Sequence, residues 1–543
     1  MMTTVQRTTV SITLALLFAV QAYAQKPAAA PKPLFDGKSW WDEVKVLADD
    51  SMEGRDTGSL GLRKAEAYAV EQLKNAGLQP AGTDGFYQTV RLVQHQIDEK
   101  NSYAFIASGN GPANPVALGD DAYFSTRVEG SDSEIDAPLV FIGNGLQVPE
   151  ANVDELAGLD LKGKVVVYLT GSPANVPAPL AAHYGSLAQR WKRLAAAGAI
   201  GTITIPNPAS MDIPWARMSL NRAHPSMDLD DPDFNDVAGL KVGLVYNPAA
   251  ADALFAGSGH TFAEIAALGK EMKLLPHFNL ATTLKARAVI QRIRLESANV
   301  VAKLPGADPS LANEYVVLSA HIDHLGIGEP VNGDRIYNGA MDNGSGTAAV
   351  LDIAASFKQH PERLRRSLLF VLVTGEEKGL LGSKYFAAHP TVPAKSIVAD
   401  VNIDMFLPIM ATKTLMILGL GESTLGSDAK SVAESLGAKV IPDPMPLRNL
   451  FVRSDQYSFI LHGIPSVAMG YFAEPNSPEQ RVFEEWLSKR YHAPSDDLNQ
   501  PVDLPAAARY EEITRKLLIK TANASSRPQW SDASFFKRYA QPQ

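Results

Sequence analysis

From about residue 315 onward, short apolar runs alternate with helical patterns, and this alternation constrains the fold more than any other feature of the chain. Such alternation is typical of a parallel sheet with helices on both faces. The apolar runs predict strands at 315–320, 367–373, 397–403, 414–418 and 465–469. The helical patterns predict helices at 345–358, 379–388, 424–436, 454–462 and 504–522. We therefore predict an α/β domain with a mostly parallel, doubly wound mixed sheet.

The chain is long enough for more than one domain, since 543 residues correspond to two or three domains of about 100–200 residues each. Residues 115–288 have a different sequence pattern, with short β-rich runs separated by Gly and Pro turns. We expect them to form a smaller, inserted β-rich domain. The α/β domain is then expected to comprise residues 36–114 and 289–525, followed by a C-terminal tail over 526–543.

The N-terminus has the pattern of a secretory signal peptide. Arg7 precedes an apolar run over 10–20, and Ala22-Tyr23-Ala24 fits the small-residue cleavage rule. A buried first helix is the alternative interpretation. We expect a signal peptide over 1–24, a linker over 25–35, and export to the periplasm or the medium. The run is shorter than the ~20 residues of a membrane span, and we expect no span in the mature chain.

Composition narrows the possible partners and mechanisms. Lys and Arg total 50 against 59 Asp and Glu, a net charge of −9, which gives no electrostatic reason to expect nucleic acid or an anionic membrane as a partner. The chain has no cysteine, which excludes disulfides and thiol chemistry. Nothing in the composition indicates an oligomeric state.

Acids and a histidine follow three of the predicted strands. His321 and Asp323 come after the first, Glu376 and Glu377 after the second, and Asp404 after the third. Ligands of open α/β sheets bind beyond the carboxyl ends of the strands. These side chains are therefore expected to share one edge of the sheet.

Two further residues complete this set: Asp342, in a Gly-rich turn before a predicted helix, and His492. Each member has an ordinary alternative explanation. Asp342 would serve as a turn or N-cap residue, and the Glu pair would complement a helix dipole. Taken together, histidines and carboxylates at one edge indicate a divalent metal site.

The ordered set of motifs resembles the M28 family of zinc-dependent aminopeptidases. The matching motifs are His321-x-Asp323, the Asp342 turn, Glu376-Glu377, Asn402-x-Asp404 and Tyr491-His492. The resemblance also covers the segment from Glu53-Gly54-Arg55 to Gly77-Leu78, and Asn299–Gly306. The resemblance covers roughly residues 36–110 and 290–525. It implies peptide substrates with a free N-terminus.

The resemblance also implies two Zn²⁺ ions that share a carboxylate. His321, Asp342 and Asp404 would hold one ion, and Asp342, Glu377 and His492 the other. A shared carboxylate suits a hydrolase whose two ions stand about 3.5–4 Å apart. The resemblance further implies a cis peptide bond between Asp342 and Asn343.

Two acidic residues are assigned catalytic roles by the same resemblance. Glu376 would be the general base, taking a proton from water and returning it to the leaving amine. Asp323 would orient His321 through the second ring nitrogen. His324 is expected to lie outside the ligand set, close to the site or on the surface. Gln456 stands where relatives often have histidine, which puts substrate contacts in doubt.

Residues 115–288 fall where some family members carry a protease-associated domain, and 162–167 and 195–205 resemble one. Such a domain would shape the entrance to the cleft or be structural. The acidic run Met227–Asp236 holds five Asp and is expected to be a solvated loop, because it lacks the spacing of a calcium-binding EF-hand.

Three other functions remain as alternatives. A serine hydrolase is disfavoured because no Gly-x-Ser-x-Gly motif follows a predicted strand. A non-catalytic, receptor-like relative is disfavoured because all the expected ligands are present. A carboxypeptidase or dipeptidase of the same family would need cations for the substrate carboxylate, and Arg448 and Arg453 are candidates.

Overall fold

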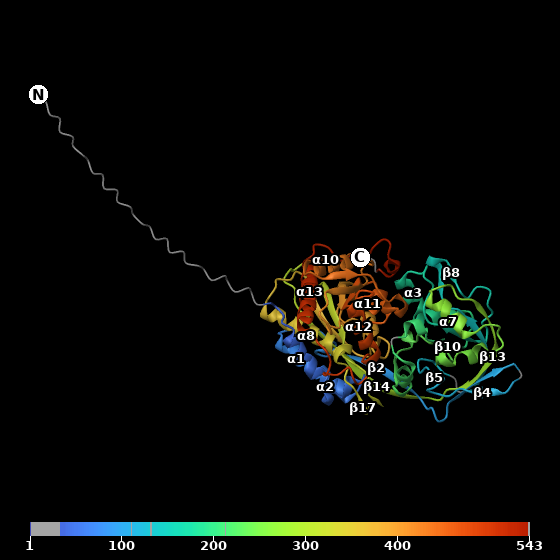
Figure 1. The fold of residues 1–543 in the computed structure, drawn as a ribbon. Helices are drawn as coiled ribbons and strands as arrows, with labels where there is room; N and C mark the ends of the chain where they lie inside the picture. Colours follow the sequence, from blue (N-terminus) through green and yellow to red (C-terminus); the bar gives the residue numbers. More distant parts are fainter. Residues whose placement is uncertain (2–32, 110, 131–132, 212, 541–543) are drawn as a thin grey trace. The chain divides into compact units, whose positions relative to one another are not determined.

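The computed structural model describes residue 1 and residues 33–540, except 110, 131, 132 and 212 (Figure 1). Phe35–Gln543 forms one compact unit. The expected signal peptide, apart from its first residue, and most of the expected linker lie outside the described residues. No helix in the described part of the chain combines the length and apolar character needed to cross a bilayer.

The larger sheet has the strand order β11-β2-β14-β18-β15-β19-β22-β20-β21, with β1 paired to β14. Its strands are β1 (Gln79–Pro80), β2 (Tyr87–Ile97), β11 (Ser226–Leu229), β14 (Ile290–Leu304), β15 (Tyr315–His321), β18 (Ser367–Val373), β19 (Ile397–Asn402), β20 (Thr414–Leu418), β21 (Lys439–Ile441) and β22 (Ser466–Tyr471). The strands predicted between 315 and 469 are thus confirmed to within two residues at their ends.

The centre of this sheet is parallel and its flanks are largely antiparallel. β18, β15, β19 and β22 run parallel, and every residue in them is buried, as expected when both faces are covered. β14 pairs antiparallel with β18 and β2, and β20 pairs antiparallel with β22. The expectation of a mostly parallel sheet is therefore wrong for the flanks. The first half of β14 is largely exposed, which an antiparallel ribbon tolerates.

Two groups of helices pack against this sheet. α8 (Ser345–Gln359) and α13 (Leu504–Asn523) contact β15. α1 (Lys38–Leu47) packs on both of these helices, and Figure 1 shows the three lying together. α9 (Leu381–Ala388) contacts β14, and α11 (Gln456–Leu461) contacts α9 and β22. The remaining helices of this part are α2 (Leu60–Asn75), α10 (Thr424–Ser435) and α12 (Pro478–Lys489). No helix was expected at α12, although Ser477 and Pro478 form a typical helix start.

A second sheet has the order β4-β3-β13-β6-β9-β10-β12-β5. Its strands are β3 (Tyr103–Ser108), β4 (Ala113–Pro115), β5 (Ala122–Phe124), β6 (Ile135–Ile142), β9 (Val165–Leu169), β10 (Gly201–Ile205), β12 (Val242–Tyr246) and β13 (His277–Arg287). It is drawn in cyan and green in Figure 1. Because β3 belongs to it, this sheet takes strands from both sides of the expected boundary at residues 114 and 115.

Short elements complete the described chain. Five helices lie along the chain between strands of the second sheet: α3 (Ala178–Gly185), α4 (Leu187–Ala196), α5 (Trp215–Met218), α6 (Asp252–Phe255) and α7 (Phe262–Lys270). Two small hairpins are formed by β7 (Gln147–Val148) with β8 (Val153–Asp154), and by β16 (Gly326–Val331) with β17 (Asp334–Tyr337). Within the expected tail, Phe536 is buried and stacks on Phe451 with ring centroids 5.1 Å apart.

One strand of the expected insert belongs to the larger sheet. β11 pairs antiparallel with the edge of β2. Its Asp228 lies 3.3 Å from His95, and Asp236 lies 2.7 Å from Lys384. The acidic run expected to be a solvated loop is therefore partly a strand, and two of its carboxylates face cationic or titratable partners.

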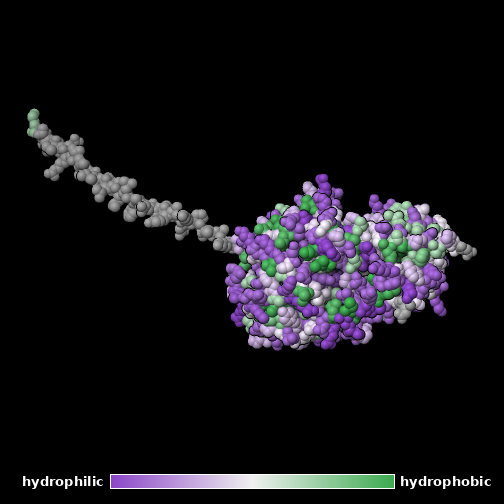
Figure 2. Space-filling view, turned by 90° about the horizontal axis from the view of Figure 1, so that it is seen from below, coloured by the Kyte–Doolittle hydropathy of each residue, from purple (hydrophilic) through white to green (hydrophobic). Residues whose placement is uncertain are grey.

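The surface seen in Figure 2 is mostly hydrophilic, with hydrophobic residues in small separate groups. The large hydrophobic residues most exposed among those described, such as Leu60, Leu274 and Ile293, come from distant parts of the chain. The apolar content of the chain is therefore concentrated in the cores that support the two sheets.

Candidate metal centre

One group of possible ligands forms where β15 and β19 end. His321 Nε2 lies 3.2 Å from Asp404 Oδ1 and 3.4 Å from Asp342 Oδ1. His321 and Asp342 are buried, and Asp404 is partly exposed. The three donor atoms are close enough to hold a single metal ion. An imidazole nitrogen with carboxylate oxygens is a donor set that suits zinc.

A second group shares Asp342 with the first. His492 Nε2 lies 3.2 Å from Asp342 Oδ2 and 3.3 Å from Glu377 Oε2. His324, which was not expected among the ligands, is buried, and its Nδ1 lies 2.6 Å from Glu377 Oε1. A surface position for His324 is therefore wrong. Because both histidines reach Glu377, the second group contains one more donor than the resemblance implied.

The turn that carries Asp342 is held by hydrogen bonds on both sides. Asp342–Asn343 is a cis peptide bond, as the resemblance implied. The Asn343 side chain donates to the Ile403 carbonyl over 2.9 Å, and its Oδ1 accepts from the amides of Gly346 and Met405. These bonds join the turn to Ile403 and Met405, the two residues that flank Asp404, so they fix the Asp342 turn to the segment that carries Asp404.

Arg55 is a buried residue that the sequence did not single out for a role at the site. Its guanidinium donates to the carbonyls of Leu47, Ile322, Asn338 and Gly339. Burial lowers the pKa of Arg55 to about 10. Because Ile322 follows His321 and Gly339 precedes the Asp342 turn, Arg55 fixes two ligand-bearing segments to each other.

Asp323 contacts both His321 and the backbone that precedes Glu377. Its main-chain carbonyl oxygen lies 3.2 Å from His321 Nδ1, whereas its carboxylate Oδ1 lies 3.9 Å from the same nitrogen. The carboxylate accepts from Thr57 Oγ1 over 2.9 Å and from the Glu376 amide over 3.2 Å. The histidine is therefore oriented through the main chain, and the carboxylate positions Glu376 instead.

The charges of the cluster shift the pKa of its members in opposite directions. Burial, together with the neighbouring Asp404 and Glu377, raises the pKa of Glu376 well above its usual range, although His321 opposes this shift. Burial also opposes ionisation of Asp342, but its hydrogen bonds to His321 and His492 lower its pKa well below the usual range. Glu376 thus has the higher proton affinity that a general base needs, and Asp342 stays a carboxylate.

Gln456 does not reach into the site. Its Oε1 accepts from Asn402 over 3.3 Å, and its Nε2 donates to the Phe451 carbonyl over 3.0 Å. Asn402 in turn accepts from Ser319 on β15. The replacement of a histidine by Gln456 therefore supports the end of β19 and supplies no ligand.

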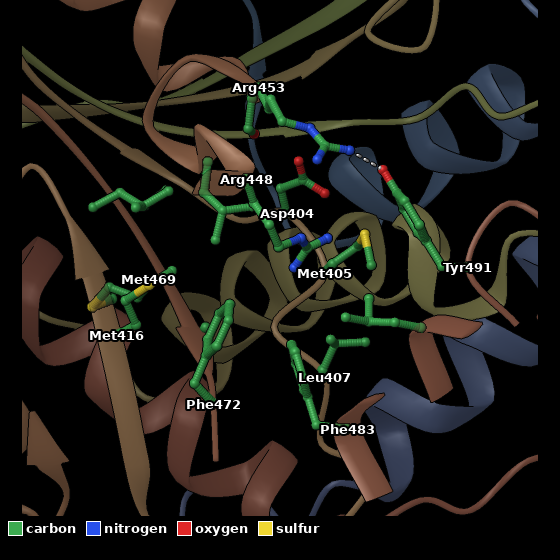
Figure 3. Close-up of a pocket in the computed structure, with 16 residues that line it drawn as sticks. Asp404, Met405, Leu407, Met416, Arg448, Arg453, Met469, Phe472, Phe483 and Tyr491 are labelled. Atoms are coloured by element: carbon green, nitrogen blue, oxygen red, sulfur yellow. Dashed lines mark hydrogen bonds between the residues drawn. The ribbon is translucent and has the colours of Figure 1, made fainter. Parts of the chain in front are cut away.

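An apolar pocket of about 100 Å³ opens beside Asp404 (Figure 3). Figure 3 shows Asp404 and Arg453 along its polar side and Phe472 and Phe483 away from them, and Arg453 donates to the Tyr491 hydroxyl over 2.9 Å. Its other walls include Met405, Leu407, Met416, Met469 and Leu487, and the buried Arg448 also lines it. A pocket with such a lining favours the binding of an apolar side chain from a ligand.

The structure thus brings every predicted site residue into one cluster: His321, Asp323, Asp342, Glu376, Glu377, Asp404 and His492. Sequence reasoning missed Arg55, His324 in its buried contact with Glu377, and Asp496, which accepts from the amide of Asp342 over 3.0 Å. Two features of the sequence could have indicated them. Arg55 lies within a motif of the resemblance, and Asp496 lies four residues after His492.

Comparison with known proteins places this cluster in a family. Residues 299–518 match the model of Peptidase family M28. Probable leucine aminopeptidase 2 of Aspergillus oryzae is 28% identical over 215 residues, which cover 37% of this chain and 40% of the relative. Aminopeptidase YwaD of Bacillus subtilis is 28% identical over 207 residues, which cover 36% of this chain and 42% of the relative. The chain therefore spans less than half the length of these relatives.

Solved structures show the same fold over most of the chain. The aminopeptidase from Aneurinibacillus sp. strain AM-1 superimposes with a TM-score of 0.55 at 19% identity, covering 91% of this chain and 95% of that one. At this identity the likeness supports the fold alone. The sequence match covers all the histidines and carboxylates of the cluster. The part of the chain that carries the cluster, residues 299–518, is thus similar in sequence to peptidase family M28.

Proposed function

We propose that this protein is a zinc-dependent aminopeptidase that hydrolyses the N-terminal peptide bond of peptides. The observation that carries the proposal is the position of Asp342. One of its carboxylate oxygens faces His321 at 3.4 Å and the other faces His492 at 3.2 Å. A carboxylate shared in this way suits two ions held side by side.

The donor set fits zinc at both positions. His321, Asp342 and Asp404 would hold one ion, and Asp342, Glu377 and His492 the other, with His324 holding Glu377 in place. Bound zinc would polarise the scissile carbonyl and make water a better nucleophile at neutral pH. The carboxylates of the chain would offset the positive charge of the zinc ions, and the histidines and carboxylates together would fix the positions of the ions.

Glu376 is the proposed general base. It lies three residues after the end of β18, its amide donates to the Asp323 carboxylate, and burial raises its pKa. Its carboxylate would take a proton from the attacking water and then give the proton to the amine that leaves. The adjacent Glu377 faces the histidines instead, so the two neighbouring acids divide the work of proton transfer and ligation.

The apolar pocket beside Asp404 is the proposed site for the side chain of the N-terminal residue. Its aromatic and methionine side chains favour leucine, methionine or phenylalanine, and Arg448 and Arg453 in its lining disfavour lysine and arginine. Methionine side chains adapt to different apolar shapes, so several apolar residues are expected to be accepted.

A panel of peptides with free and blocked N-termini, assayed with and without a chelator, tests the proposal. We expect hydrolysis of peptides with free N-termini, loss of activity with the chelator, and recovery with added zinc. Equal activity on blocked and free N-termini would contradict an aminopeptidase. Release of C-terminal residues from blocked peptides would indicate the carboxypeptidase alternative, and binding without turnover would indicate the receptor-like one.

Export is a separate proposal that rests on the first 24 residues. Mass spectrometry of the purified mature protein is expected to find Gln25 at the N-terminus, in a periplasmic or culture-medium fraction. An intact N-terminus in the cytoplasmic fraction would contradict it.

A further inference from the structure

A second cavity, of about 600 Å³, opens beside Glu377 and His492. Arg453 and Tyr491 line both this cavity and the apolar pocket, so the two meet at this pair. One wall carries Glu376 and comes from the part of the chain that carries the metal centre. Other lining residues, including Arg127 and Arg222, come from the part of the chain between strands β5 and β12 of the second sheet.

Several cations line this larger cavity, and most of them face a carboxylate at close range. The ion pairs are Lys384 with Asp236 at 2.7 Å, Lys378 with Asp56 at 2.8 Å, and Arg222 with Glu99 at 3.1 Å. These cations are therefore already balanced by the protein.

Arg127 differs from these cations. Among the described residues, its guanidinium forms no ion pair with a carboxylate. Its Nε is buried without a hydrogen-bond partner; Arg222 Nε also lacks a well-oriented hydrogen bond, but it has the Glu99 carboxylate at 3.1 Å. Its own amide is anchored by Ser125 Oγ over 3.2 Å. A buried guanidinium nitrogen without an acceptor is costly unless a ligand supplies one.

The guanidinium of Arg127 lies against the turn that carries the proposed general base. A Cβ atom placed on Gly379 would come within 2.8 Å of Arg127 Nη1 and 3.0 Å of its Cζ, so this close approach requires glycine. The amide of Gly379 donates to the Glu376 carbonyl over 2.8 Å. Arg127 therefore lies close to the backbone of Glu376, in a cavity that also reaches Glu377 and His492.

We propose that Arg127 binds a carboxylate on the leaving side of the substrate. The inference rests on the proposed function: with the N-terminal side chain in the apolar pocket and the scissile bond at the metal centre, the rest of the peptide enters the larger cavity. The planar guanidinium holds a carboxylate through two hydrogen bonds. That carboxylate is either the C-terminal one of a dipeptide or tripeptide, or an acidic side chain just after the cleaved bond.

Matched peptides test the assignment. The set is Leu-Ala-Ala with a free C-terminus, the same peptide with a C-terminal amide, and Leu-Glu-Ala amide. Each is assayed as kcat/KM with the zinc-loaded wild type, Arg127→Met, Arg127→Lys and Arg222→Met. Arg222→Met is the matched control, because it removes an arginine from the same cavity whose charge is already paired with Glu99.

We expect Arg127→Met to lower the ratio of kcat/KM for the preferred carboxylate-bearing peptide to that for Leu-Ala-Ala amide by about 10- to 100-fold, mainly through KM. Arg127→Lys keeps the charge without the planar fork and is expected to fall between. Arg222→Met is expected to keep the wild-type ratio. The peptide that loses its advantage, free acid or Leu-Glu-Ala amide, identifies the source of the carboxylate.

Two results would overturn the inference, and both can be distinguished from a failure of the proposed function. If Arg127→Met folds with the wild-type melting temperature and keeps the wild-type ratios, Arg127 binds no substrate carboxylate, while hydrolysis of the amides still supports an aminopeptidase. If Arg127→Met and Arg222→Met lower the ratios equally, the effect is general cavity charge and the specific assignment fails. Failure of the wild type to hydrolyse any of the three peptides would overturn the proposed function itself.

Discussion

The carboxylate of Asp496 accepts a hydrogen bond from the backbone amide of Asp342 over 3.0 Å. The amide of Met341 donates to both oxygens of the same carboxylate, and the Asp496 carbonyl accepts from the amide of Ala340. Asp496 follows His492 by four residues in the chain. The segment that provides one proposed ligand therefore also holds the turn that provides the shared one.

This contact predicts that Asp496→Asn weakens metal binding. Asparagine keeps one oxygen but replaces the other with an amide NH₂, which would face the Met341 N–H in either orientation, because that N–H reaches both oxygens. Loss of such an outer contact typically costs 10- to 100-fold in metal affinity, and we expect about that loss here. Competition with a chromophoric chelator measures it. Asp497→Asn is the control, since Asp497 Oδ1 accepts from Asn499 and lies away from the turn; an equal loss in both variants would contradict the role of Asp496.

Glu376→Gln and Glu377→Gln are expected to fail in different ways. Glu376→Gln removes the proposed proton carrier, and kcat should fall by about 10²- to 10⁴-fold with metal content unchanged. Glu377→Gln removes a proposed ligand that faces His492 at 3.3 Å, and metal content should fall. Activity assays paired with elemental analysis distinguish the two. Metal loss in Glu376→Gln would show that this residue is itself a ligand.

His492 and His324 both contact Glu377, and their variants separate a ligand from a supporting residue. His492→Asn is expected to reduce the bound metal from two ions per chain towards one. His324→Gln is expected to keep two ions at lower affinity, because His324 Nδ1 positions Glu377 from 2.6 Å. Isothermal titration of the metal-free protein with zinc gives both numbers. The opposite result would make His324 the ligand.

The apolar pocket predicts a specificity change in Phe483→Leu. Phe483 is buried, lines the pocket and packs on Phe472 with ring centroids 4.8 Å apart. A smaller side chain enlarges the pocket, so the preference for phenylalanine over leucine at the substrate N-terminus should rise by about 10-fold. Aminoacyl arylamides measure this ratio. Phe278→Leu, in the second sheet, is the matched control, and an equal change there would contradict the assignment of the pocket.

Glu155 predicts how the stability of the protein depends on pH. Its side chain is buried and accepts from the Leu146 amide over 2.9 Å, and burial raises its pKa from 4.5 to about 7. A raised folded-state pKa contributes stability below pH 4.5 that is lost as the pH rises through 7. Glu155→Gln cannot ionise, so relative to wild type its free energy of unfolding should increase between pH 4 and pH 8, by about 3 kcal/mol.

Urea unfolding of both proteins across this pH range measures the difference. The test is the change with pH and not the absolute stability, because glutamine alters the local hydrogen bonds at every pH. Parallel pH curves for the two proteins would show that Glu155 does not titrate in the folded state near neutral pH.

The centre of the sheet and the ends of its strands were predictable because they depend on local pattern. Continuous apolar runs identify β15, β18 and β19, and the residues after them fall at one edge once the strands are parallel. The partners of the flanking strands, and therefore their pairing direction, were not predictable in this way. β14 follows directly after β13 in the chain, yet β13 pairs within the second sheet and β14 within the larger one.

The supporting residues of the site could not be read from spacing. Arg55 reaches carbonyls 267 and 284 residues further along the chain, and Asp496 reaches back across 154 residues. Such contacts follow from the tertiary fold and leave no periodic signal. The same holds for Arg127, whose place beside Gly379 depends on how segments from different parts of the chain pack. The likeness of residues 115–288 to a protease-associated domain stays a prediction.

The pairing of β11 with β2 has a consequence for engineering. Without Ser226–Leu229, the outer edge of β2 would lose its partner at Leu92–His95. An open edge presents unpaired amide and carbonyl groups that can pair with a strand of another molecule, which promotes aggregation. The stretch 115–288 is therefore not a detachable module: a truncated chain that lacks it would need a substitute for β11 to remain monodisperse.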